Sequence, residues 1–145
     1  MIRFARNAAV VAAFFLLFDI PWLLAMAGTY RGWIGPLMAE DTSLGYAVVF
    51  YLAYSAAAYW LAVRPALESG SLRMAAISGA VLGFAAYGTY GFTNAATLRD
   101  WPAQMLLIDT IWGTLLTASI CAAAYATIRR IDRRTDGKAP ISRRP

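Results

Sequence analysis

The chain has 145 residues, of which 60% are hydrophobic, and its mean hydropathy of +0.53 indicates a membrane protein rather than a soluble domain. The single cysteine and the absence of histidine exclude a disulfide within one chain and any metal site built from His and Cys, and they suggest no cofactor. The net charge of +5 comes mainly from a basic C-terminal end without interleaved aromatic residues, so an anionic membrane leaflet is favoured over nucleic acid as partner.

Four apolar segments follow one another along the chain, and each has about the 20 residues that a helix needs to cross a bilayer. The predicted helices are residues 7–27, 45–63, 74–94 and 103–128. We expect the second helix to end at Arg64-Pro65, because a residue before proline is pushed out of helical geometry. The sequence thus predicts an all-α fold, a four-helix transmembrane bundle over residues 1–130, and a basic, disordered tail at 131–145.

The first segment also resembles a secretory signal peptide. Arg3 and Arg6 precede it, and Ala25-Met26-Ala27 is similar to a cleavage site. Asp19 and Pro21 interrupt the stretch that should be apolar in a signal peptide. A retained membrane helix is therefore favoured.

The distribution of basic residues predicts the orientation in the membrane. Eleven of the thirteen Lys and Arg residues lie before the first segment, between the second and third, or after the fourth, which places both termini in the cytoplasm. The other two connections hold only Arg31 and Arg99. The first of these, residues 28–44, is expected to be a loop with Tyr30 and Trp33 at the membrane interface.

Polar side chains fall in one layer of the predicted bundle, about 8 to 13 Å below the outer interface at about 1.5 Å per residue. The layer contains Asp19, Tyr51, Tyr54, Tyr87 and Asp109, and Tyr90 and Asn94 continue the stripe of Tyr87 toward its helix end. A carboxylate at the centre of a membrane helix costs about 3 kcal/mol, so it normally faces the interior and has a partner. Because no intramembrane basic residue is present, the two aspartates are expected to share a proton or recruit a cation. Alternatively, each only caps nearby backbone or binds a tyrosine.

Two short segments around the aspartates share one pattern. Residues 16–22 (LLFDIPW) and 106–112 (LLIDTIW) both read L-L-x-D-x-x-W, which resembles the inverted repeats of transporters because the two helices run in opposite directions. The pattern places Trp22 and Trp112 one helical turn from an aspartate. A duplication or a chance match in leucine-rich sequence both account for it.

Small residues mark the expected helix contacts. Gly79 and Gly83 are four residues apart on the stripe of Tyr87, and Gly113 shares the stripe of Asp109. Glycines at this spacing let two membrane helices approach closely. We therefore expect these three residues to serve helix packing.

Several of these motifs occur together in one known family. They are Phe18-Asp19 with Trp22, Phe50-Tyr51-Leu52-Ala53-Tyr54, Val63-Arg64-Pro65-Ala66, Tyr87-Gly88-Thr89-Tyr90 with Thr93-Asn94, and Asp109 with Trp112-Gly113. Over residues 10–120 the chain resembles the DUF2177 family of bacterial four-helix membrane proteins, which has no established activity. Members are often encoded near fatty-acid-modifying enzymes of the cyclopropane-synthase type, so the resemblance implies the bacterial inner membrane and a lipid-related role. The family commonly has an acidic residue after Tyr90, where this chain has Gly91-Phe92, so that acid is either dispensable or lost here.

These observations favour three functions. The first is an outer-side pocket, formed by the two aspartates and the tyrosines, that binds a lipid-derived or small polar ligand or serves a lipid-modifying enzyme as an accessory. The second is a proton- or cation-coupled transporter, expected to be a homo-oligomer because four helices rarely enclose a full path. The third is a structural or assembly subunit that packs through its glycines. An enzyme acting alone is least favoured, because neither a nucleophile-base pair nor a metal cluster is visible.

Overall fold

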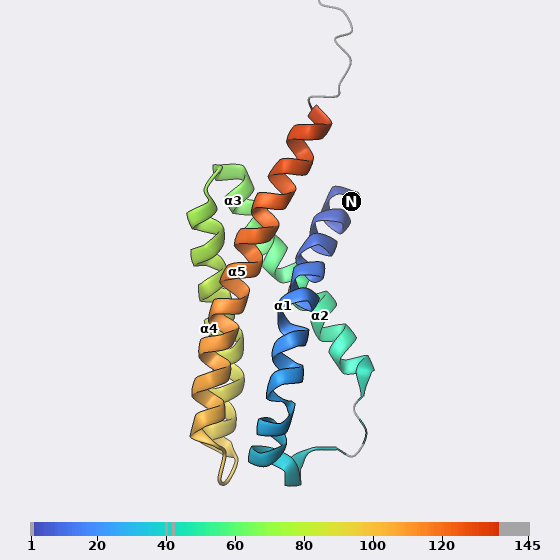
Figure 1. The fold of residues 1–145 in the computed structure, drawn as a ribbon. Helices are drawn as coiled ribbons and strands as arrows, with labels where there is room; N and C mark the ends of the chain where they lie inside the picture. The colour runs from blue at the N-terminus through green and yellow to red at the C-terminus, as the bar shows by residue number, and fades with distance from the viewer. Residues whose placement is uncertain (1, 40, 42, 137–145) are drawn as a thin grey trace, which may run out of the picture.

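The computed structural model describes residues 2–39, 41 and 43–136, and all regular structure in these ranges is helical (Figure 1). The predicted all-α class with four helical segments is confirmed: α1 (Ile2–Ile34), a composite helix from Leu44 to Ser69, α4 (Leu72–Thr97) and α5 (Ala103–Asp136). Three of them, all except α4, are long and apolar enough to span a membrane. Leu24, Val49 and Leu107 illustrate the large apolar side chains that remain exposed, as expected for helices that face hydrocarbon.

The first helix is longer than predicted. It continues through Pro21 and Gly28 to Ile34, and a short 3₁₀ turn, η1 (Gly35–Leu37), follows. Proline and glycine interrupt membrane helices less readily than soluble ones, because apolar surroundings offer the freed backbone groups no water. The predicted loop at 28–44 is therefore helical in its first part.

The second helix does not end at Arg64-Pro65. It consists of α2 (Leu44–Ala58), a π-helical turn η2 (Tyr59–Val63) and α3 (Arg64–Ser69). The Arg64 N–H bonds the carbonyl of Tyr59, five residues earlier, and this wider turn accommodates a proline ring that would clash in a regular α-helix. The chain reverses at Gly70, whose φ of 71° gives the left-handed end that glycine adopts easily.

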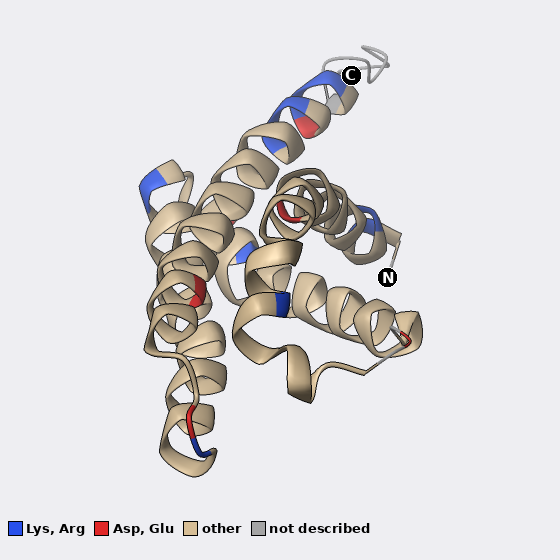
Figure 2. Ribbon diagram, turned by 60° about the horizontal axis from the view of Figure 1, so that its bottom comes forward, with Lys and Arg blue, Asp and Glu red and all other residues tan. Residues whose placement is uncertain are grey.

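One end of the bundle carries the N-terminus, the α3–α4 turn and the last turns of α5 (Figure 1). There Arg6 forms an ion pair of 2.7 Å with Asp132, and Arg129 Nη1 donates to the carbonyl of Gly70 at 3.3 Å. Further arginines, blue in Figure 2, lie at the end of α5 and at the start of α1. The cytoplasmic location of this end stays a prediction. Residues 131–136 of the predicted tail continue α5, and its remainder lies outside the described residues.

The tightest contact joins α4 and α5, which run antiparallel. A Cβ atom on Gly79 would lie 2.7 Å from the carbonyl oxygen of Thr117. A Cβ atom on Gly83 would overlap the carbonyl oxygen of Gly113. Gly113 in turn lies directly against the ring of Tyr87. These three glycines therefore set the distance between the two helices and leave α4 room to direct Tyr87 inward.

Candidate functional site

A cavity of about 300 Å³ lies among α1, α2, α4 and α5, on the half of the bundle away from the chain termini. Two carboxylates and seven aromatic side chains are among its eleven lining residues, and none of the eleven is basic. We call this cavity the acidic aromatic pocket. Its lining residues are Asp19, Trp22, Leu23, Tyr30, Phe50, Tyr51, Tyr87, Tyr90, Met105, Asp109 and Trp112.

Asp19 is the buried acid of the pocket, with 5% of its surface exposed. The Tyr51 hydroxyl donates to its Oδ2 at 2.6 Å, and the Trp112 indole N–H donates to its Oδ1 at 3.2 Å. Each oxygen thus has one donor, and the donors come from α2 and α5. The carboxylate therefore ties three helices together.

Asp109 is less enclosed and has fewer partners. The Tyr30 hydroxyl donates to its Oδ1 at 2.5 Å and itself accepts the indole N–H of Trp22 at 3.1 Å. Its second oxygen, Oδ2, has no hydrogen-bond partner among residues 2–39, 41 and 43–136. This oxygen can therefore accept a further hydrogen bond.

The two L-L-x-D-x-x-W segments meet in space through their tryptophans. The Trp22 and Trp112 rings stack with centroids 4.1 Å apart and an angle of 9° between their planes. Each tryptophan serves the aspartate of the other segment: Trp112 donates to Asp19 directly, and Trp22 reaches Asp109 through Tyr30. The repeated Asp-x-x-Trp spacing therefore corresponds to a reciprocal contact between the two segments in the structure.

A second cavity of about 240 Å³ adjoins the pocket between α2 and α4. It is lined by Phe50, Ala86, Tyr87, Tyr90 and Asp109, of which all but Ala86 also line the acidic aromatic pocket. In Figure 1, α2 leans away from α4 toward its N-terminal end, and Phe50 lies just before the middle of α2. The pocket therefore extends sideways between these two helices.

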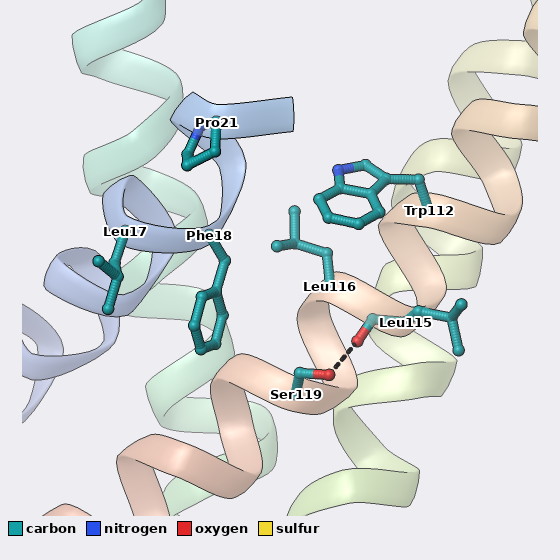
Figure 3. A pocket seen from close by; sticks show the side chains of 7 residues that line it. All are labelled: Leu17, Phe18, Pro21, Trp112, Leu115, Leu116 and Ser119. Carbon is teal, nitrogen blue, oxygen red and sulfur yellow. Dashed lines mark hydrogen bonds between the residues drawn. The ribbon is translucent and has the colours of Figure 1, made fainter. Parts of the chain in front are cut away.

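An apolar groove lies between α1 and α5, on another side of Trp112 (Figure 3). It has a volume of about 390 Å³ and is lined by Leu17, Phe18, Pro21, Trp112, Leu115, Leu116 and Ser119. The Ser119 hydroxyl donates to the carbonyl of Leu115 at 2.7 Å, so its proton is already used. Trp112 lines both the groove and the acidic aromatic pocket, so the two cavities meet at this side chain.

Most predicted site residues line the pocket, and two do not. The Tyr54 side chain is buried in the core, where its hydroxyl pairs with Thr117 Oγ1 at 3.2 Å, because it lies nearly a turn deeper than Tyr51. Asn94 lies a turn beyond Tyr90, and its carbonyl accepts the N–H of Leu98 at the end of α4. Neither side chain belongs to the pocket.

Four lining residues of the pocket were not predicted from the sequence: the apolar Leu23, Phe50 and Met105, and the polar Tyr30. Tyr30 matters most, because it binds one of the two aspartates. It was expected in an interfacial loop, but it lies on α1 and binds Asp109. The stripe of Asp19, Trp22 and Met26 continues to Tyr30 at helical spacing, so a longer first helix would have revealed it.

Within the described ranges, no group of three or more His, Cys, Asp or Glu side chains is placed to hold a metal ion. The pocket instead combines carboxylates with hydroxyl and indole donors. It suits proton exchange or the binding of a positively charged or hydrogen-bond-donating group.

Comparison with known protein families identifies the family of this chain. The DUF2177 family, described as "Predicted membrane protein (DUF2177)", matches residues 5–126, a range that contains every residue of the pocket. No curated protein and no solved structure matches the chain significantly.

Proposed function

The chain belongs to the DUF2177 family of predicted membrane proteins, and because that description states no activity, we propose from the pocket itself that this protein binds a lipid-derived or small polar ligand there. The observation that carries the proposal is that Asp19 and Asp109, from different helices, line one cavity with no basic residue in its lining. A ligand would then supply the partner that the chain does not.

The free energy of insertion supports this reading. Each carboxylate costs about 3 kcal/mol at the centre of a membrane helix, and apolar side chains would pack four helices without that cost. Asp19 recovers part of it through two donors, whereas Asp109 has one donor and a free oxygen. A binding site needs a carboxylate oxygen that is free to accept from a ligand, as in Asp109, whereas an acid with a purely structural role does not.

A lipid-derived ligand fits the surroundings of the pocket. The apolar groove adjoins it through Trp112 and offers space for a hydrocarbon chain, while the second cavity gives a route between α2 and α4. We further propose that the protein lies in a bacterial inner membrane, with the pocket toward the outer side, and serves lipid modification there. An enzyme of that process is the proposed partner.

Analysis of co-purified ligands tests the proposal. The full-length protein, Asp109→Asn and Asp100→Asn would be purified from native membranes in mild detergent and analysed by native mass spectrometry. Asp100 is an exposed acid outside the pocket, so its variant controls for the loss of one charge. We expect the wild type and Asp100→Asn to retain a bound molecule, and we expect at least tenfold less of that molecule to co-purify with Asp109→Asn. Equal retention by all three, with unchanged membrane lipids in strains carrying Asp19→Asn or Asp109→Asn, would refute pocket binding.

Proton- or cation-coupled transport is the second candidate, favoured by the chain of donors from Trp22 through Tyr30 to Asp109. In proteoliposomes with a pH gradient, Asp109→Asn should then abolish uptake, whereas Asp100→Asn should not. Four helices would need a second copy of the chain to enclose a path.

A structural or assembly subunit is the third candidate, favoured by the close contact at Gly79 and Gly83. This function predicts no phenotype when both pocket aspartates are replaced, and loss of complex assembly when either glycine is enlarged.

A further inference from the structure

We propose that the chemical group recognised in the acidic aromatic pocket is an organic ammonium ion, either a protonated amine or a quaternary ammonium. This inference rests on the proposed ligand-binding function and names its ligand class. It follows from the charge of the pocket, from the aromatic residues that line it and from the hydrogen bonds already made inside it.

The charge of the lining selects a cation. Asp19 and Asp109 are its only carboxylic acids, and no Lys or Arg is among the eleven residues. Arg31, one residue after Tyr30, is exposed and does not line the cavity. An anionic group such as a phosphate would meet carboxylates without a compensating cation, so the pocket disfavours it.

The aromatic walls select an organic cation over a metal ion. Calcium takes six to eight oxygen ligands and magnesium demands near-octahedral oxygen geometry, as a general rule. Here three of the four carboxylate oxygens already accept a hydroxyl or indole proton. The remaining lining is mostly aromatic, and an ammonium group is attracted to the faces of such rings as well as to a carboxylate.

The position of the free acceptor places the ammonium group. Asp109 lines both the acidic aromatic pocket and the second cavity, as do Tyr87, Tyr90 and Phe50. The hydroxyls of Tyr87 and Tyr90 make no side-chain hydrogen bond within the part of the chain that the structure describes. A cation between Asp109 and these rings would contact the open carboxylate oxygen without displacing Tyr30.

The size of the pocket fits a head group. About 300 Å³ is at the lower end of the range of ligand cavities. A free amine would fit in it alone, whereas the ammonium head of a lipid would continue with its chains into the apolar groove or between α2 and α4. The two sources share one chemistry and differ in what lies beyond the nitrogen.

A charge-only comparison tests the inference. The full chain would be placed in nanodiscs of phosphatidylglycerol, which carry no amine, and titrated with choline or with its neutral carbon isostere 3,3-dimethyl-1-butanol. Binding would be followed by tryptophan fluorescence, since Trp22 and Trp112 line the pocket, and by calorimetry. A parallel set of nanodiscs would contain phosphatidylethanolamine or phosphatidylcholine, with bound lipid identified by native mass spectrometry.

Four variants sharpen the result. Asp109→Asn removes the charge, and Tyr90→Leu removes one ring at a position that is 46% exposed, so little buried packing is lost. Asp100→Asn and Tyr46→Leu are the matched controls at exposed sites outside the pocket. We expect at least tenfold weaker binding for each pocket variant and no change for either control.

The outcomes separate the ligand class from the binding function. Preference for choline over the isostere by at least tenfold, or specific retention of an ammonium lipid, supports the inference and identifies the source. Equal binding of the isostere, or preference for an anionic or neutral lipid that Asp109→Asn abolishes, overturns the ammonium class and leaves the pocket function standing. If no ligand of any charge is retained in an Asp109-dependent way, both fail.

Discussion

Replacement of Gly83 by alanine should destabilise the protein, although alanine is the better helix former. A Cβ atom at this position would overlap the carbonyl oxygen of Gly113 and crowd the Thr117 side chain across the contact between α4 and α5. The carbonyl belongs to a helix backbone and cannot rotate away, so the two helices must separate. Overpacking of this kind costs about 1–3 kcal/mol, and we take the upper value because backbone is involved.

The intrinsic preference of alanine for a helix offsets about 1 kcal/mol of that cost, which leaves an expected net loss of about 2 kcal/mol in the free energy of unfolding. Gly28→Ala is the matched control. Gly28 is exposed on α1, and no heavy atom outside its own helix lies within 4 Å of the position a Cβ would take. That variant should gain about 0.5–1 kcal/mol from the same change of residue.

Unfolding of both variants by SDS in mixed micelles, followed by far-UV circular dichroism, measures the difference. Gly79→Ala extends the comparison, since its Cβ would lie 2.7 Å from the carbonyl oxygen of Thr117 and should also destabilise. If Gly83→Ala proved as stable as Gly28→Ala, the close approach of α4 and α5 would be refuted, together with the position it gives Tyr87.

Two further substitutions test contacts at opposite ends of the bundle. Tyr30→Phe removes only the hydroxyl that donates to Asp109, so the free energy of unfolding should fall by about 1.5–3 kcal/mol, as for other hydrogen bonds to charged groups. Tyr46→Phe, at an exposed position, should leave the free energy of unfolding unchanged. Equal stabilities of the two variants would place Tyr30 in the interfacial loop after all. Arg6→Gln breaks the partly exposed ion pair with Asp132 and should cost no more than about 1 kcal/mol, measured by the same unfolding assay, and a larger loss would mean that this pair is more buried than its surface exposure indicates.

The number of helices followed from the sequence because span length depends only on bilayer thickness and on the rise per residue. Their ends did not follow, since proline and glycine rules describe chains in water. The helix continues past Arg64-Pro65 through a π-helical turn, and Gly28 lies within α1. Extending the first helix by two turns is what brings Tyr30 to Asp109.

Membership of the pocket could be predicted in large part, but its hydrogen bonds could not. Depth and helical phase place Asp19 and Asp109 on inward stripes, and both line the cavity. The pairing of Trp112 with Asp19, and of Trp22 with Tyr30, depends on side-chain conformations across two helices. Spacing within one helix cannot specify such contacts.

The structure shows what surrounds position 91, where the resemblance to the family implies an acid. Gly91 is buried against α5, and a Cβ there would lie 2.6 Å from the end of the Leu106 side chain and 3.5 Å from Thr110 Oγ1. The Thr110 hydroxyl is buried and has no hydrogen-bond partner among the residues described. An acidic side chain at position 91, as the resemblance to the family implies, would reach this hydroxyl once the flexible Leu106 moved aside. It would then lie in the contact between α4 and α5, outside the pocket lining, so its absence here leaves the pair of Asp19 and Asp109 intact.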